Sequence, residues 1–264
     1  KGQWSAMGST ANITGRLLAK NLTGEETAYG GCMGTGVVKL AEGLNAGRTG
    51  LTEEQAKAAG YDVITVTCVT DDKAHYYPDA STFLTKLIAD KASHKLLGIQ
   101  VLGGGAVDKM VDIAVTGIAM GAQVEDFDTL DFAYAPPFST AIHPFVQACY
   151  ILENKLEGSY ESMTPAEYLA GKAKGYKVID VSPAPAIPGA KWVDLAKVTG
   201  PIEGLEKDEK LLLVCAKGKR GYFLQNRLKA YGYTNTRALE GGLFVNNVKV
   251  TFAGGKLPPE EIKR

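Results

Sequence analysis

The most constraining feature of the sequence is a short apolar run that ends at a cysteine and is followed by a helix. Residues 211–214 are four consecutive apolar residues, typical of a strand that is buried on both faces of a parallel sheet. The loop 215–220 follows, and the spacing of Leu224 and Leu228 predicts a helix over 221–231. A strand, a short loop and a helix in this order favour an open α/β sheet, in which ligands bind at the carboxyl ends of strands.

The loop begins with Cys215, where a thiolate could be stabilised. The thiolate is the nucleophilic form of cysteine, and inward-turned backbone N–H groups and the positive end of a following helix both favour it. Lys217, Lys219 and Arg220 add local positive charge, and Gly218 allows the loop to curl tightly. We therefore expect Cys215 to be a nucleophile. The alternative is a buried and chemically inert packing residue.

Composition excludes several other functions. Lys+Arg and Asp+Glu both number 29 in 264 residues and only 8% of residues are aromatic, so we expect no nucleic-acid or membrane partner. The four cysteines are widely spaced and there are only three histidines, so no metal site is expected. Sparse cysteine usage favours the cytoplasm. The sequence begins at Lys1 rather than Met, and we expect it to be a fragment of a longer protein.

The chain divides by pattern into two regions, with a polar join at 157–162. In the first region, β-branched and apolar runs predict strands, and three-four spacing and capping signals predict helices. Because these strands cluster before the main helices, we expect an α+β domain with a mostly antiparallel sheet. The predicted strands are 34–40, 63–69, 83–88 and 96–102, with the last two forming a hairpin. The predicted helices begin near residue 8, at a capping box of Thr52 and Gln55, near residue 107 with a stop at Gly121, and at about 144 with an end at about 156.

The second region alternates helices with short apolar strands. Thr164 and Glu167 form a capping box with Pro165 at the first helical position. Residues 177–181 read as a buried strand, and 236–239 as a further strand. This alternation predicts an α/β domain, a parallel sheet flanked by helices.

The loop of the second region fits the pattern C-x-x-G-x-R, which resembles the active loop of the rhodanese-like family. Its neighbours fit the same family: the strand 178–181 with its aspartate, the turn 187–190, and the closing segments 231–235 and 239–242. The resemblance covers about 164–248. It departs from the family at Ser182, where arginine is usual, at the missing histidine before residue 187, and at Gly221, where serine is common.

This resemblance implies a sulfurtransferase site in which Cys215 carries a persulfide. It implies Arg220 as a second catalytic residue. The sulfur- or anion-binding loop would consist of Ala216, Lys217, Gly218 and Lys219. Cys32, Cys68 and Cys149 have no such surroundings and are expected to be packing residues.

The first region resembles the dimerisation domain of flavin-dependent pyridine nucleotide-disulfide reductases. The motifs are 34–35, 49–52, 74–78 and 130–139, and the likeness is strongest to the branch of coenzyme A-disulfide reductases, NADH oxidases and persulfide reductases. Some members of this branch carry a rhodanese domain at the carboxyl terminus. The resemblance implies residues 1–158 as the tail of an FAD domain plus the dimerisation domain, 163–264 as a rhodanese-like domain, and a homodimer formed through the former.

The same resemblance implies roles for individual residues. Tyr76 and Tyr134 would lie near the reactive sulfur of the partner subunit, where a phenol can donate a hydrogen bond to a developing thiolate. The alternative is packing at a dimer interface. Ala11 and Asn12 would lie at a helix amino terminus that faces FAD. His143, which precedes a proline, is expected to be a surface or interface residue without a catalytic role.

We therefore expect the C-terminal part of an FAD-dependent coenzyme A-disulfide or persulfide reductase, which uses NAD(P)H and small sulfur compounds such as thiosulfate, persulfides and coenzyme A. No G-x-G-x-x-G follows a strand, so the chain alone is not expected to perform the redox step. One alternative is a dimerisation and docking module with an inactive rhodanese domain. Another is part of an NADH oxidase.

Overall fold

The computed structural model describes residues 5–250 and divides into two compact units. The first unit consists of the chain up to residue 65 together with 72–145. The second consists of 66–71 together with the chain from 146 onward. Each unit is described by itself.

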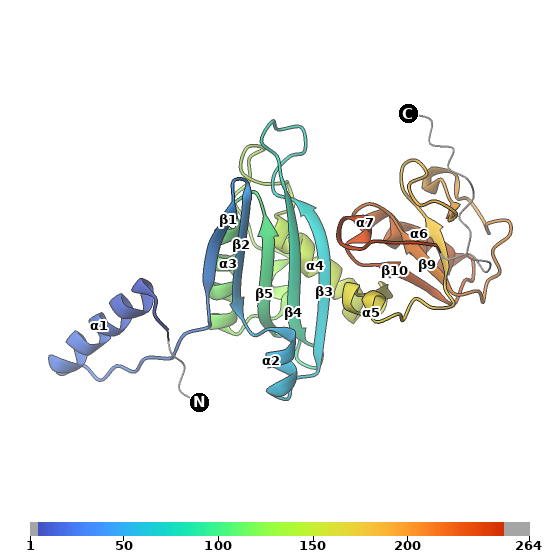
Figure 1. Ribbon diagram of the computed structural model, residues 1–264. Coiled ribbons are helices and arrows are strands. Elements are labelled where there is room, and N and C mark those ends of the chain that lie inside the picture. Colours follow the sequence, from blue (N-terminus) through green and yellow to red (C-terminus); the bar gives the residue numbers. More distant parts are fainter. Residues whose placement is uncertain (1–4, 251–264) are drawn as a thin grey trace. The chain divides into compact units, whose positions relative to one another are not determined.

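Most of a five-stranded sheet with the order β1-β2-β5-β4-β3 lies in the first unit, and residues 66–71 of β3 are counted with the second (Figure 1). The pairs β1–β2, β2–β5 and β4–β5 are antiparallel, as predicted for this region. Four strands agree with the sequence prediction, whereas β2 was not predicted, because its glycines and polar residues show no strand-like alternation. The bounds are β1 Gly36–Ala41, β2 Leu44–Gly50, β3 Val63–Asp71, β4 Thr82–Asp90 and β5 Leu96–Gly103.

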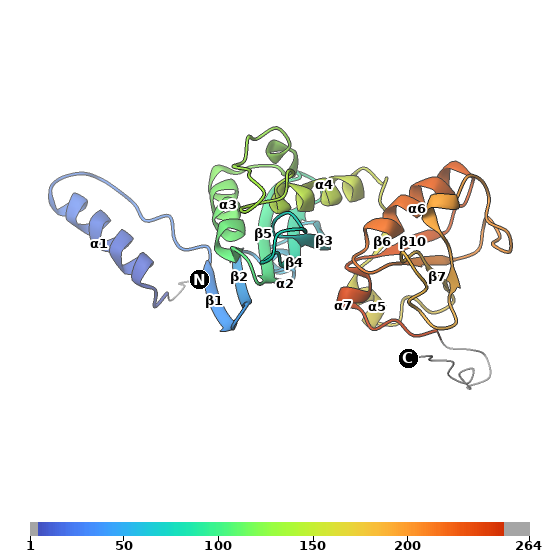
Figure 2. The same ribbon diagram turned by 90° about the horizontal axis from the view of Figure 1, so that it is seen from above.

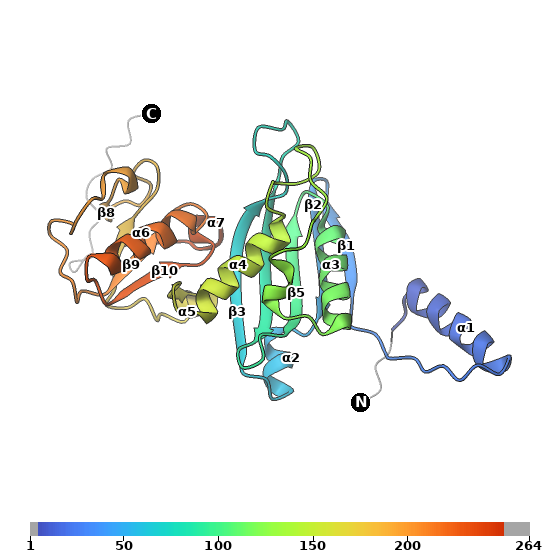
Figure 3. The same cartoon turned by 180° about the vertical axis from the view of Figure 1, so that it is seen from behind.

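Helix α3 (Val107–Met120) covers one face of this sheet (Figure 3). Its apolar stripe is buried, and it ends at Gly121, whose φ of 72° is left-handed, as the sequence predicted. Gly47 on β2 lets the helix approach closely, because a Cβ there would lie 2.7 Å from the side chains of Val107 and Val111. The packing of α3 against β2 therefore requires glycine at position 47.

The other helices of the first 156 residues also follow local signals. Helix α2 (Glu53–Ala58) begins with the predicted capping box of Thr52 and Gln55, and α4 (Pro144–Leu156) has the predicted bounds. Helix α1 (Gly8–Leu22) has no buried residue, and Ile13, Leu18 and Leu22 on it are exposed. A short 3-10 helix, η1, spans Val124–Phe127.

The second unit contains a parallel sheet with the order β6-β10-β9-β7-β8. Leu211 and Leu213 of β9 pack with α6 on one face, and Leu212 and Val214 pack on the other face, where α5 and α7 lie (Figure 2). The bounds are β6 Ser162–Met163, α5 Pro165–Leu169, β7 Lys177–Asp180, β8 Lys191–Trp192, η2 Leu195–Lys197, β9 Leu211–Val214, α6 Lys219–Ala230, β10 Thr236–Leu239 and α7 Gly242–Val245. The α+β and α/β predictions are both confirmed.

Two details differ from the sequence prediction. Helix α6 begins at Lys219 rather than Gly221, because Gly218 turns the chain with a φ of 96° and the next two residues are already helical. The polar join at 157–162 is packed rather than loose: Tyr160 is buried, and Ser162 begins β6 and donates a hydrogen bond to Glu240 at 2.6 Å.

Candidate functional site

Cys215 lies in the second unit between the carboxyl end of β9 and the amino end of α6. The residue is only 3% exposed, and its Sγ accepts a hydrogen bond from the Gly218 N–H at 3.2 Å. Gly218 has a positive φ, in the left-handed region. A Cβ on this residue would lie 3.4 Å from the carbonyl oxygen of Leu239. The backbone of the loop thus folds over the sulfur, and an N–H together with the positive helix end favours negative charge there.

A second loop holds the first one in place. The N–H groups of Leu243 and Phe244 donate to the carbonyl oxygens of Cys215 and Ala216, both at 2.9 Å. Gly242, with a φ of 50°, could not carry a side chain, because a Cβ would lie 2.0 Å from Cys215 O. This supporting role of 242–244 was not predicted; the available signal was the glycine pair that follows a buried strand.

Arg220 lies in the first turn of α6 and links it to the end of β7. Its Nε donates to the carbonyl oxygen of Val181 at 2.5 Å. The next residue, Gly221, has a packing reason for its size, since a Cβ there would lie 3.0 Å from Leu213 O on β9. The helix therefore sits close to the strand that presents Cys215.

The lysines of the loop are not equivalent. Lys217 forms an ion pair with Asp71 at 2.6 Å, and both side chains are partly exposed. Lys219 stands over the ring of Phe223, with its Nζ 5.8 Å from the ring centroid. The positive charge of Lys217 is thus partly neutralised by Asp71, whereas Lys219 extends along the surface of α6.

Asp180 organises the segment in which the sequence departs from the rhodanese-like pattern. This buried carboxylate accepts backbone hydrogen bonds from Ser182 at 2.9 Å, Ala186 at 2.6 Å and Ile187 at 3.0 Å. Burial alone would raise the pKa of Asp180, but these hydrogen bonds outweigh it and the pKa is lowered. Backbone hydrogen bonds to one aspartate therefore shape this short, proline-rich segment, which lacks the arginine and histidine usual in the family.

The other cysteines do not form comparable sites. Cys68 and Cys149 are buried, and Cys32 is partly exposed. Burial, followed by the charge of Glu240, raises the pKa of Cys68 to about 12, which disfavours its thiolate. The burial of Cys68 and Cys149 agrees with packing roles, whereas the role of Cys32 stays a prediction.

The residues assigned to the flavin half lie in the first unit. Tyr76 follows β3 and is 67% exposed, and Tyr134 precedes α4 and is 52% exposed. Ala11 and Asn12 lie on the exposed α1, where Asn12 donates to Gly8 O at 2.8 Å. The pairings given above for this sheet are antiparallel. The assignment of Ala11 and Asn12 to FAD stays a prediction.

The surface part of the prediction for His143 is wrong, whereas its interface part stays a prediction. The residue is only 5% exposed, so it is not a surface histidine. Its ring stacks on Phe132, with centroids 5.1 Å apart, and it lines a cavity of the first unit. Phe132 lies 11 residues from His143 in sequence, and no local sequence pattern predicts that the two rings stack.

Two family descriptions match the chain. Residues 42–145 match the pyridine nucleotide-disulphide oxidoreductase dimerisation domain, and residues 164–245 match the rhodanese-like domain. The first segment contains strands β2 to β5 of the antiparallel sheet, and the second contains strands β7 to β10 of the parallel sheet.

Several characterised proteins are similar in sequence. An NAD(P)H sulfur oxidoreductase (CoA-dependent) of Pyrococcus furiosus is 33% identical over 150 residues, which are 57% of this chain and 34% of the relative. A coenzyme A disulfide reductase of Staphylococcus epidermidis is 29% identical over 129 residues, 48% of this chain and 28% of the relative. The chain thus spans about a third of the length of these relatives.

Solved structures extend the likeness across both domains. A NAD-dependent persulfide reductase from A. fulgidus has a TM-score of 0.83 at 32% identity and covers 92% of this chain and 44% of its own. A Bacillus anthracis protein described as CoADR-RHD has a TM-score of 0.84 at 30% identity and covers 93% of this chain and 45% of its own.

Within residues 5–250, no helix has the length and hydrophobicity required to cross a membrane. The antiparallel sheet, the parallel sheet with its cysteine loop, and the sequence and structural matches agree with one another. The chain therefore contains a dimerisation domain of the pyridine nucleotide-disulphide oxidoreductase family, followed by a domain of the rhodanese-like family.

Proposed function

We propose that Cys215 accepts a sulfane sulfur atom from a small donor and passes it to an acceptor thiol. The observation that carries this proposal is the Gly218 N–H directed at Sγ, within a loop held from behind by the amides of Leu243 and Phe244. A backbone donor aimed at a cysteine sulfur at the end of a parallel strand, beside a helix amino terminus, is suited to a thiolate nucleophile.

The reaction balances in two steps. In the first, the Cys215 thiolate attacks the outer sulfur of thiosulfate, the S–S bond of the donor breaks, and sulfite leaves with the bonding electron pair. In the second, an acceptor thiolate attacks the outer sulfur of the Cys215 persulfide, which regenerates the Cys215 thiolate and yields a persulfide of the acceptor. The Gly218 N–H stabilises the anionic sulfur in both resting states.

The surrounding residues have supporting roles in this proposal. Arg220 anchors the first turn of α6 to the end of β7 through Val181 O. The loop residues Ala216, Lys217, Gly218 and Lys219 surround the sulfur or anion, with Lys217 shared with Asp71. Because Cys215 is nearly buried, a slender donor that presents a terminal sulfur is favoured over a bulky one.

We propose further that the parent protein is an FAD-dependent coenzyme A-disulfide or persulfide reductase. The names of the relatives and the shared order of the two domains support this. In this proposal residues 1–158 include the tail of an FAD domain and form a homodimer, residues 163–264 form the rhodanese-like domain, and the protein is cytoplasmic. FAD, which carries electrons from NAD(P)H, would be held mainly by other parts of the parent, and coenzyme A is the proposed acceptor.

A docking domain without catalysis is the second candidate. The burial of Cys215 and the ion pair of Lys217 with Asp71 favour it, because both restrict access to the loop. In that role the second unit would bind a partner protein and transfer no sulfur.

Steady-state transfer of sulfur from thiosulfate to cyanide tests the proposal. We expect turnover by the chain and a loss of at least about a thousandfold in Cys215→Ser, because the nucleophile is removed. Cys32→Ser is the matched control and should retain full activity. Equal rates in the wild type and Cys215→Ser would remove Cys215 from the mechanism, and no turnover by a folded wild-type chain would favour the docking role.

A further inference from the structure

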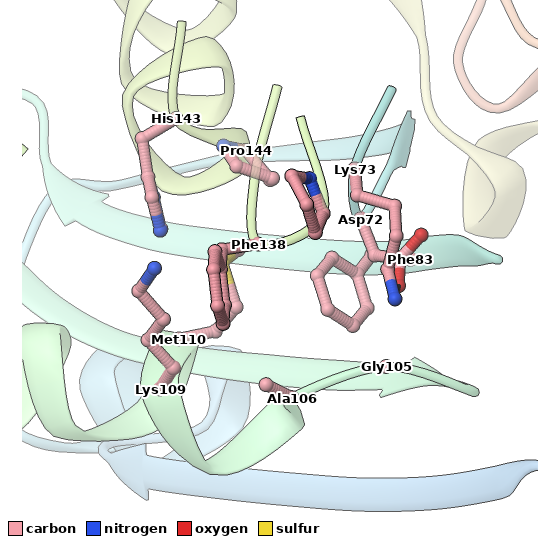
Figure 4. A pocket seen from close by; sticks show the side chains of 11 residues that line it. Asp72, Lys73, Phe83, Gly105, Ala106, Lys109, Met110, Phe138, His143 and Pro144 are labelled. Atoms are coloured by element: carbon pink, nitrogen blue, oxygen red, sulfur yellow. Dashed lines mark ion pairs between the residues drawn. The ribbon is translucent and has the colours of Figure 1, made fainter. Parts of the chain in front are cut away.

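A cavity of about 190 Å³ lies in the first unit, at the amino ends of two helices (Figure 4). Lys109 and Met110 line it from the first turn of α3, and His143 and Pro144 line it at the start of α4. The cavity is larger than a single water molecule requires and can hold a small ligand.

His143 presents a hydrogen-bond donor to this cavity. Its Nδ1 accepts a hydrogen bond from the Phe145 N–H at 3.2 Å, so the ring proton resides on Nε2. Burial, followed by the charge of Lys109, lowers the pKa of His143 to about 4, so the ring is neutral near pH 7. Among the described residues the hydrogen bond of His143 is the one that its Nδ1 accepts, and the residue is 5% exposed. Nε2 is not fully enclosed by protein atoms, so it is open to the cavity that His143 lines.

Lys109 supplies a second donor at the same place. Figure 4 shows its side chain directed toward the imidazole of His143. No carboxylate within residues 5–250 forms an ion pair with Lys109. The two donors face each other and no acceptor from the described residues lies between them. An anion bound there would accept a hydrogen bond from each.

The helix ends and the remaining charges agree with an anion in this position. The amino ends of α3 and α4 both carry partial positive charge, and Ala106 at the start of α3 provides no side-chain cap. The nearby carboxylate, Asp72, lies beyond Phe83 and Phe138 in Figure 4. It is held there by the Ser81 N–H at 2.6 Å and lies 4.0 Å from Lys73.

We propose that this cavity binds a tetrahedral oxyanion, a phosphate- or sulfate-type group, between Lys109 Nζ and His143 Nε2. Charge-assisted hydrogen bonds from both donors would hold two of its oxygens. Met110, which is buried, and Phe138, which is 75% exposed, line the remaining side. This inference is independent of the Cys215 chemistry.

Nuclear magnetic resonance of the histidine rings in the full 264-residue chain tests the proposal. Inorganic phosphate and sulfate are titrated separately at constant ionic strength, with His75 and His94 as internal references. We expect a saturable shift of the His143 ring signals and a rise in the pKa of His143, because a bound anion stabilises the imidazolium. Lys109→Met should weaken binding about tenfold or more, since it removes a charged hydrogen bond, whereas Lys91→Met, at an exposed lysine, should leave binding unchanged.

Further arms separate the sources of the oxyanion and guard against misfolding. Phenyl phosphate that binds more tightly than inorganic phosphate would identify a phosphorylated small molecule as the ligand class, and the reverse order would identify the free ion. His143→Gln keeps one N–H donor and should retain weakened binding. The proposal fails if His143 signals do not respond to any of these anions, or if Lys109→Met and Lys91→Met bind phosphate equally.

Discussion

The two regions differ in what holds their candidate reactive groups in place. Around Cys215, each restraint comes from nearby backbone: Gly218 donates to the sulfur, and Leu243 and Phe244 hold the carbonyls of the loop. Tyr76 and Tyr134, by contrast, lie on loops with more than half of their surface exposed. A preorganised site needs neighbours that fix its geometry. The comparison indicates that the backbone holds the loop of Cys215 within the second unit, whereas Tyr76 and Tyr134 stand more than half exposed in the described chain.

The largest structural effect should come from Gly242→Ala. A Cβ would lie 2.0 Å from Cys215 O and 2.8 Å from Ala216 O, at a φ of 50°. We expect a loss of about 2–4 kcal/mol in the free energy of unfolding, together with a large loss of sulfur transfer. Urea unfolding followed by Trp192 fluorescence in a Trp4→Phe background measures the first quantity.

Gly200→Ala is the matched control in the same unit, because no atom lies within 4 Å of its Cβ position. It should change the unfolding free energy by less than about 0.5 kcal/mol. If Gly242→Ala were as stable and active as this control, the turn at 242–244 would not be what holds the cysteine loop.

A smaller effect is expected at Asp180, which shapes the neighbouring segment. Asp180→Asn replaces an acceptor with a donor opposite backbone N–H groups and should cost about 1–3 kcal/mol near pH 7. The folded-state pKa is lowered, so the wild-type contribution is present above the ordinary pKa of 3.8 and is lost as the pH falls through the folded value. Urea unfolding from pH 7 to pH 3 should show the gap between wild type and variant closing only below about pH 4.

The exposed Asp208→Asn serves as the control for that series and should show no such gap. A constant difference between wild type and Asp180→Asn across the whole pH range would mean that the carboxylate charge contributes nothing to folding.

The smallest effect is expected at the tyrosines. Tyr76→Phe and Tyr134→Phe remove only exposed hydroxyl groups, so each should change the unfolding free energy of this chain by less than about 0.5 kcal/mol. Sulfur transfer from thiosulfate to cyanide should stay within about twofold of the wild type. A large loss of sulfur transfer in either variant would show that the tyrosines and the Cys215 loop do not act separately.

Elements with a strong local pattern could be predicted from the sequence. The capping boxes at Thr52 and Thr164 formed as expected, and α4 and β10 have the predicted bounds. The cysteine loop was found for the same reason, because its strand, its glycine and its cations are adjacent in the chain. Local chemistry decides these features before tertiary packing does.

Features that depend on distant partners could not be predicted. Strand β2 is a strand because β1 and β5 pair with its two edges, not because of its own glycine-rich sequence. The predicted start of α6 was two residues too late. The positive φ of Gly218 lets the helix begin at Lys219, and the spacing of apolar side chains gives no information on that φ. His143 was assigned to a surface or interface because its burial depends on Phe132 and on the cavity beside α3.

The central claim is that Cys215 carries sulfur, and the most direct measurement is the intact mass of the chain after incubation with thiosulfate and removal of excess reagent. The account predicts a mass gain of one sulfur atom, mapped by peptide analysis to Cys215, released as thiocyanate on addition of cyanide, and absent in Cys215→Ser. No mass gain in the folded wild-type chain, or the same gain in Cys215→Ser, would contradict it.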